Sequence, residues 1–149
     1  MDMQRRIDSV CDMRSTDEAM ISLVDDEADV LEATATLLRS LGYVVRTFTS
    51  AQEFLVSNAL DDTECVIADV MMRGIDGFEL QRRIARRGLQ FPVIFLTAIS
   101  GTRTKESLMS EGAFDVLSKP CSQEQLIDSL EAALERGRKL STTRDRPHS

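Results

Sequence analysis

The residues best suited to chemistry each stand at the end of a short apolar run. Asp25 and Asp26 follow Ile-Ser-Leu-Val, and Asp69 follows Cys-Val-Ile-Ala. Thr97 ends Val-Ile-Phe-Leu-Thr, and Lys119 follows Val-Leu-Ser. Three carboxylates brought together would repel one another and require a cation, and Mg²⁺ is a hard ion that prefers oxygen ligands. We therefore ask whether the fold brings these side chains to one place.

The elements that position them alternate between strands and helices. The middle runs, Val93–Leu96 above all, are apolar throughout, which is typical of parallel strands covered on both faces. Apolar residues between the runs recur at helical spacing, as from Val30 to Leu41 and from Leu126 to Leu134. This pattern predicts an α/β doubly wound domain with a five-stranded parallel sheet and helices on both faces. The predicted strands are Met20–Val24, Tyr43–Phe48, Cys65–Ala68, Val93–Thr97 and Asp115–Ser118.

Helix boundaries carry chemical signals of their own. Three pairs fit a capping box, in which side chains bind free backbone N–H groups at the start of a helix. Gly42 follows the first predicted helix, where a left-handed cap would lie. The three pairs are Ser50 with Glu53, Asp76 with Glu79, and Ser122 with Gln125.

Length and composition restrict the class of protein. The 149 residues suit one domain, which we place at residues 19–137, after a flexible arm or short extra helix (1–18) and before a basic tail (138–149). A net charge of −7 argues against general nucleic-acid binding. The sequence shows no secretory signal and no apolar run long enough for a bilayer, so we expect a cytoplasmic protein. Cys11, Cys65 and Cys121 are expected to be free thiols, and His148 alone cannot build a histidine-based site.

Right-handed crossovers bring the carboxyl ends of all parallel strands to one edge of the sheet. Each candidate has an ordinary interpretation by itself. Asp26 could cap a helix, Asp69 could belong to a turn, and Thr97 could serve strand packing. Lys119 could be a surface lysine. A shared edge is the simpler explanation for all of them together.

These motifs in this order resemble the receiver domain of two-component response regulators. The Asp76-Gly77 dipeptide also falls where that family has it. The resemblance implies a flavodoxin-like fold with strand order 2-1-3-4-5. It also implies a phosphoprotein that accepts a phosphoryl group on Asp69 from a histidine kinase or a histidine phosphotransfer protein. Such a chain catalyses its own phosphorylation and dephosphorylation and switches protein–protein interactions.

The resemblance also implies roles for individual residues. Asp26, Asp69 and the backbone carbonyl of Met71 would bind Mg²⁺ directly, with Mn²⁺ as a possible substitute, and Asp25 would bind through water. Asp69 would attack phosphorus, Lys119 would pair with a phosphoryl oxygen, and Thr97 would close over the new charge.

Output is expected through the surface of the fourth helix, fifth strand and fifth helix, with a homodimer possible on activation. No helix-turn-helix follows Arg136, so direct DNA binding by this segment is not expected, and no membrane contact is expected.

Two positions depart from the family pattern. Arg73 stands where proline is common, so the loop lacks that restraint, and we hypothesise that its cation engages the phosphoryl group or an acidic partner. Val116 stands where an aromatic residue often turns inward, while Phe114 lies on the opposite strand parity and is assigned to the core or the preceding loop. The Lys119–Pro120 bond is a candidate for the cis form.

Three alternatives remain open. A degenerate receiver would act as a phosphorylation-independent binding module. A hydrolase of the haloacid-dehalogenase type would need a second aspartate where Met71 stands. A flavin-binding protein of the same fold would need a phosphate loop where Asp25 and Asp26 lie, and their charge would repel a phosphate.

Overall fold

The computed structural model describes residues 19–98 and 102–145. Its five strands form one parallel sheet in the order β2-β1-β3-β4-β5, which confirms the predicted topology. The strands follow the predicted runs closely, although β2 begins one residue later than expected and β3 includes Asp69. Their bounds are β1 Met20–Val24, β2 Val44–Phe48, β3 Cys65–Asp69, β4 Val93–Thr97 and β5 Asp115–Ser118.

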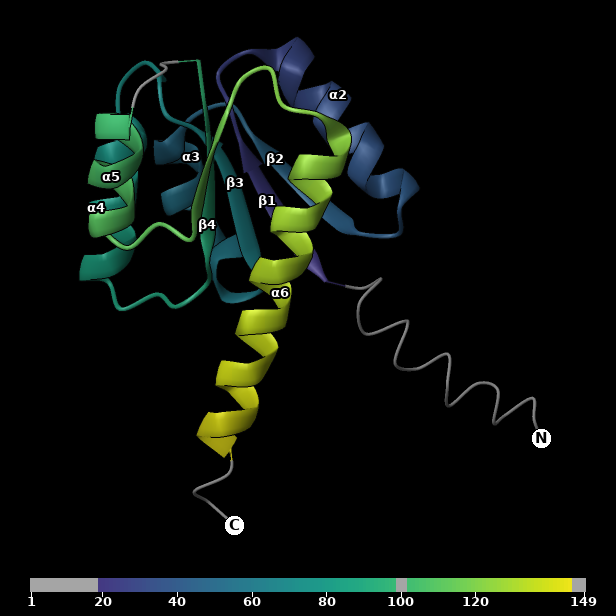
Figure 1. Ribbon diagram of the computed structural model, residues 1–149, viewed down its shortest axis with the longest axis vertical. Helices are drawn as coiled ribbons and strands as arrows, with labels where there is room; N and C mark the ends of the chain where they lie inside the picture. Colours follow the sequence, from purple (N-terminus) through teal and green to yellow (C-terminus); the bar gives the residue numbers. More distant parts are fainter. Residues whose placement is uncertain (1–18, 99–101, 146–149) are drawn as a thin grey trace, which may run out of the picture.

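Helices cover both faces of the sheet (Figure 1). One face carries α2 and α6, and the other carries α3, α4 and α5. A short 3-10 helix, η1 (Asn58–Asp61), lies between α3 and β3. The helices are α2 Ala28–Ser40, α3 Ala51–Leu55, α4 Gly77–Arg86, α5 Thr102–Ser110 and α6 Gln123–Asp145.

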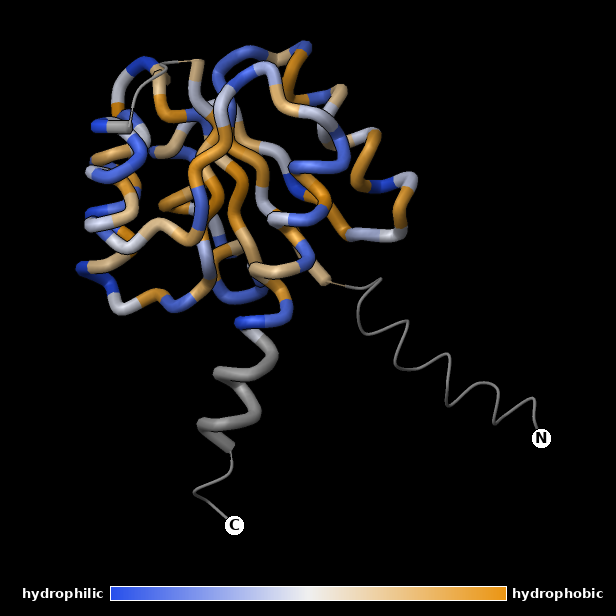
Figure 2. Tube along the Cα trace, viewed as in Figure 1, coloured by the Kyte–Doolittle hydropathy of each residue, from blue (hydrophilic) through white to orange (hydrophobic). Residues whose placement is uncertain are grey.

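The central strands are buried along their whole length, as their apolar sequences predict. Every residue of β3 and β4 is buried, whereas the edge strand β2 alternates between exposed and buried positions. Figure 2 shows the same arrangement, with hydrophobic residues concentrated in the sheet and hydrophilic ones on the outer sides of the helices. Because side chains alternate along a strand, each central strand contributes to two separate cores.

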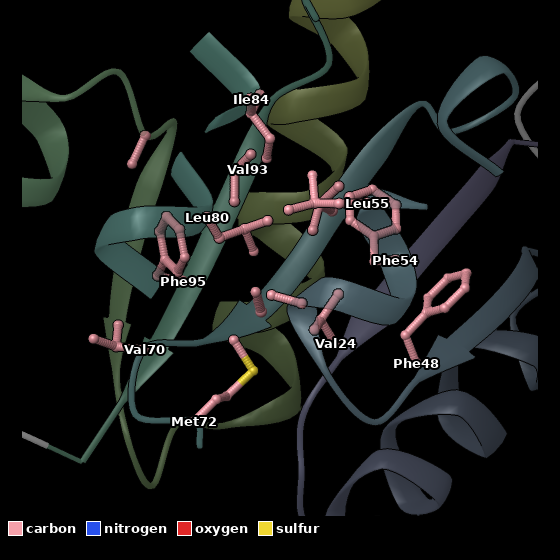
Figure 3. Packing of buried hydrophobic residues seen from close by; sticks show 14 of the residues in the cluster. Val24, Phe48, Phe54, Leu55, Val70, Met72, Leu80, Ile84, Val93 and Phe95 are labelled. Atoms are coloured by element: carbon pink, nitrogen blue, oxygen red, sulfur yellow. The ribbon is translucent and has the colours of Figure 1, made fainter. Parts of the chain in front are cut away.

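The α3/α4/α5 core contains Phe54, Leu80 and Phe95, all fully buried (Figure 3). Its aromatic rings meet edge to face, with the centroids of Phe48 and Phe54 5.3 Å apart. The α2/α6 core, on the other face, contains Leu38, Ile94 and Leu130, each 0% exposed. Burial on both faces stabilises the central strands and so fixes the positions of their carboxyl ends at the edge of the sheet.

The predicted helix boundaries are largely confirmed. Hydroxyl or carboxylate oxygens of Ser50, Asp76 and Ser122 accept hydrogen bonds from the backbone N–H three residues later. Gly42 has φ 99°, and its N–H donates to the Arg39 carbonyl while the next N–H donates to Leu38, which closes the end of α2 in a Schellman motif.

The helical backbone of α6 continues to Asp145, through most of the segment that we predicted as a basic tail. The predicted N-terminal arm (1–18), which includes Cys11, lies outside the described residues, and so does His148. Within the described residues, Cys65 and Cys121 are free thiols. No helix of the described segments is both long enough and apolar enough to span a membrane. The Lys119–Pro120 peptide bond is cis, as predicted.

Gly77 provides a test of the packing between β3 and α4. A Cβ at this position would lie 2.8 Å from the Cα of Val70, a backbone atom that cannot easily move. We expect Gly77→Ala to lower the free energy of unfolding by about 1–3 kcal/mol in urea titrations, the usual cost of overpacking. Gly137→Ala is the control, since no atom lies within 4 Å of its added Cβ and alanine favours a helix. Equal stability of the two variants would contradict the close approach.

Candidate functional site

The carboxyl ends of β1 and β3 bring the predicted acids together. Val24 pairs with Ala68 in the sheet, so the residues that follow them, Asp25 and Asp69, lie side by side. Carboxylate oxygens of Asp25, Asp26 and Asp69 all lie within 4.8 Å of one another. The structure therefore gathers at one point the three acids that the sequence placed at separate strand ends.

The three acids differ in exposure. Asp25 and Asp69 are 6% and 8% exposed, whereas Asp26 lies at the surface end of the group, with 20% of its side chain exposed. Asp26 does not cap α2: the helix begins after Glu27, whose own side chain makes no cap hydrogen bond. The alternative interpretation of Asp26 as an ordinary helix cap is therefore wrong.

Lys119 reaches the same point from the end of β5. Its Nζ lies 3.4 Å from Oδ2 of Asp69 and 3.8 Å from Oδ2 of Asp25. The ammonium group thus compensates the two buried acids, and it is placed to meet any negative charge that develops on Asp69. The backbone N–H of Met71 donates to Oδ1 of Asp69 at 3.3 Å, so both oxygens of this carboxylate have a partner.

Thr97 ends β4 at the same edge and is 2% exposed. Its carbonyl oxygen accepts a hydrogen bond of 2.7 Å from the backbone N–H of Lys119, which ties the ends of β4 and β5 together. The Thr97 hydroxyl and the Lys119 ammonium group thus lie at the ends of adjacent strands that are joined by a backbone hydrogen bond. All five residues singled out from the sequence lie at the carboxyl edge of the sheet.

Two pKa values in the acidic group move in opposite directions. Burial raises the pKa of Asp25, an effect that the Glu27 backbone N–H partly offsets and the nearby Asp69 charge reinforces. The pKa of Asp26 is lowered, chiefly because the backbone N–H of Arg73 donates to its carboxylate at 3.0 Å. The buried acid is thus the harder one to ionise.

The three carboxylates are a suitable donor set for a metal ion. The ligand atoms are hard oxygens on rigid strand ends, and their charges are incompletely compensated by Lys119. Hard divalent cations bind such groups and retain water in the remaining positions. The residues present therefore fit a small divalent cation.

The departures from the family pattern are also visible. Val116 is 6% exposed in the α3/α4/α5 core, so an aliphatic side chain occupies the position where the pattern often has an aromatic one. Phe114 packs on the α2/α6 core, with the guanidinium of Arg136 4.8 Å from its ring centroid. Phe114 thus lies in the loop directly before β5 and is partly buried against that core, in agreement with its assignment to the core or the preceding loop. The contact of Arg73 with Asp26 was not expected, because no sequence signal reports how a loop folds back on an acid.

Fold and site together define a parallel α/β domain with three acids and a lysine gathered at the carboxyl edge of its sheet. Comparison with known proteins gives the family. Residues 21–131 match the response regulator receiver domain, so the chain belongs to this family. It is 37% identical over 121 residues to the transcriptional regulatory protein TdiR of Thauera aromatica, an alignment that covers 81% of this chain and 53% of TdiR.

Other relatives agree. Nodulation protein W of Bradyrhizobium diazoefficiens is 36% identical over 122 residues, which cover 82% of this chain and 54% of that protein. The solved structure of the response regulator StyR superposes with a TM-score of 0.80 at 30% identity, covering 88% of this chain and 66% of StyR. A receiver domain from Clostridium thermocellum gives 0.77 at 29% identity, covering 82% and 98%. The chain spans about half the length of the curated relatives it matches.

The raised pKa of Asp25 leads to a prediction about stability. A carboxyl whose folded pKa is raised stabilises the fold at pH below 3.8, and this contribution is lost as the pH rises through the folded pKa. Asp25→Asn resembles the protonated form. The metal-free variant should therefore melt above the wild type at pH 7, by about 3 °C for each kcal/mol gained.

The advantage should shrink toward pH 3, where the wild-type acid is itself protonated. Thermal melts in EDTA at both pH values provide the measurement, with Asp29→Asn on the exposed start of α2 as the control. A wild-type protein more stable than Asp25→Asn at pH 7 would show that pairing with Lys119 outweighs burial.

Proposed function

We propose that the chain accepts a phosphoryl group on Asp69 in a reaction that needs Mg²⁺, with Mn²⁺ as a possible substitute. The observation that carries this proposal is the approach of three carboxylates within 4.8 Å, with the Lys119 ammonium 3.4 Å from Asp69. Asp26, Asp69 and the backbone carbonyl of Met71 would hold the cation directly, and Asp25 would hold it through water. A bound cation would draw negative charge from the phosphoryl oxygens.

The residues of the chain perform the remaining work. A carboxylate oxygen of Asp69 attacks phosphorus, while the bond from phosphorus to the donor's imidazole nitrogen breaks and its electron pair stays on the imidazole. The product is an acyl phosphate on Asp69. Lys119 then pairs with a phosphoryl oxygen instead of the carboxylate alone. Attack of water on the same phosphorus reverses the modification and releases inorganic phosphate.

Thr97 would carry the change away from the site. Its hydroxyl closes over the phosphoryl group, and the start of α5 shifts with the end of β4. The other end of α5 is anchored, because Gln81 donates to the Glu111 carbonyl at 3.3 Å and Arg82 pairs with the Glu111 carboxylate at 3.2 Å. Movement at one end with anchorage at the other would tilt α5. Val116 adds no aromatic rotor to this motion.

A histidine kinase or histidine phosphotransfer protein is the expected donor, and its histidine must reach Asp69. An open groove of about 610 Å³ lies beside the site, between α2 and the start of α6. Apolar residues such as Val30, Leu37 and Pro120 line it, and Lys119 lies at its border with the site. We propose this groove as the docking surface for the donor.

Output would use the surface of α5, β5 and α6. Met109 on α5 is 41% exposed, an apolar side chain available to a protein partner or a second copy in an activated dimer. We place the receiver unit at residues 19–137. The matched relatives are about twice as long as the aligned region, so any output beyond this unit is likewise a proposal.

One observation favours a second function, a receiver that binds partners without phosphorylation. Arg73 already pairs with Asp26, so a positive charge partly compensates the acidic group in the absence of a metal. Phosphorylation by a small-molecule donor distinguishes the two functions.

Acetyl phosphate with Mg²⁺ should phosphorylate the wild type, because any donor with a good leaving group can serve the same carboxylate. Asp69→Asn should incorporate no phosphoryl group, since the amide is a far weaker nucleophile. Intact-mass spectrometry and phosphate-affinity gels provide the measurement. Asp62→Asn, at an exposed acid after η1, should behave as the wild type, and EDTA should abolish incorporation. A wild type that stays unmodified under these conditions would favour the binding-module function.

Hydrogen exchange tests the transmission step. On phosphorylation, exchange of the amides in residues 103–107 at the start of α5 should change by about threefold or more, because this end of the helix moves. The amides of residues 111–113, beside the Gln81 and Arg82 contacts, should change little. Asp69→Asn with acetyl phosphate is the control. Identical exchange along the whole of α5 in both states would contradict a tilt of the helix.

A further inference from the structure

Arg73 supplies two hydrogen-bond donors to one metal-ligand candidate. Its backbone N–H lies 3.0 Å from Oδ2 of Asp26, and its side-chain Nε lies 3.4 Å from the same oxygen. The sequence interval between the two residues is 47, so this contact joins the loop after β3 to the loop after β1. The phosphoryl transfer proposed above assigns no role to this guanidinium.

The path of the loop creates this contact. Gly74, directly after Arg73, has φ 77°, a left-handed conformation that turns the chain back. The N–H of Gly77 then donates to the Val70 carbonyl at 2.8 Å and closes the loop. A proline in place of Arg73 would have no N–H, and both hydrogen bonds to Asp26 would be lost. Arg73 therefore does more than replace the stiff proline of the family pattern, because it also places a positive charge beside Asp26.

Two cationic side chains pair with different members of the acidic group. Lys119 lies near Asp25 and Asp69, whereas Arg73 lies near Asp26. The two cations also differ in burial: 24% of the Lys119 side chain is exposed, against 89% for Arg73. Lys119 is held in place by its surroundings. The Arg73 side chain can leave Asp26 without disturbing any packed neighbour.

We propose that Arg73 is a resident counter-cation that competes with the divalent metal for Asp26 and so sets the metal concentration at which the site fills. This inference rests on the proposed metal-dependent function. A divalent ion on an Asp26 oxygen would lie only a few ångströms from the guanidinium, and the two like charges repel. The side chain must move into solvent when metal binds, while the backbone N–H can remain on Asp26. The metal-free site is thereby stabilised against the loaded one.

The size of the effect follows from the exposure of the arginine. Water and salt screen a charge that is almost fully exposed, so the repulsion is moderate. We expect removal of the guanidinium to tighten Mg²⁺ binding about three- to tenfold at low salt. The difference should narrow as the ionic strength rises, because the interaction is between charges at the surface.

Isothermal titration of metal-free protein with Mg²⁺ tests the proposal directly and needs no phosphoryl transfer. Arg73→Ala and Arg73→Gln remove the charge and keep the backbone N–H, and both should bind Mg²⁺ more tightly than the wild type. Arg73→Lys keeps the charge and should stay within about twofold of the wild type. Arg86→Ala, at the far end of α4, removes an equal charge remote from the site and should bind as the wild type.

The outcomes separate this inference from the proposed function. If the wild type binds Mg²⁺ and the two neutral variants bind it equally or more weakly, the competition is refuted and the metal site stands. If no variant shows saturable binding, the metal site fails, and the inference fails with it. If Arg86→Ala tightens binding as much as Arg73→Ala does, net charge rather than the contact with Asp26 sets the affinity, and the proposal is overturned.

Discussion

The mutual repulsion of three carboxylates is the constraint around which this domain is built. Left alone, Asp25, Asp26 and Asp69 would separate. The pKa of Asp25 is raised chiefly by its burial and further by the nearby charge of Asp69. The sheet holds them because β1 and β3 are packed on both faces and bonded along their length. Two protein cations reduce the repulsion without removing it. The remaining negative charge is what would favour a divalent ion in the proposed metal site.

Much of this arrangement could be predicted from sequence, for a physical reason. The buried strands consist of apolar residues, so the first polar residue after each run marks the carboxyl edge of the sheet. Asp69, Thr97 and Lys119 could therefore be assigned to one edge from their positions along the chain. Strand order rested on the resemblance to receivers, since an apolar run does not specify its neighbour. The capping signals worked because they are local, acting within three or four residues.

Features that depend on long-range geometry could not be predicted. The bond from Arg73 to Asp26 follows from the left-handed turn at Gly74, and neither residue indicates where the loop will lead. A buried hydroxyl pair, Ser22 with Thr63 at 2.7 Å, joins β1 to the segment between η1 and β3, and no sequence pattern indicates this contact. Ser129 likewise donates to Asp115 at 2.7 Å, a contact set by the register of α6 on β5.

The division of the hydrophobic interior into two cores has a consequence for how such a protein can diversify. The sheet is a partition, with α2 and α6 on one side and α3, α4 and α5 on the other (Figure 1). Substitutions that adapt the helices on one side of the sheet to a new protein partner would not change the packing on the opposite side. Because α6 belongs both to the proposed donor groove and to the proposed output surface, changes in this helix would affect both surfaces, whereas α3 and α4 belong to neither.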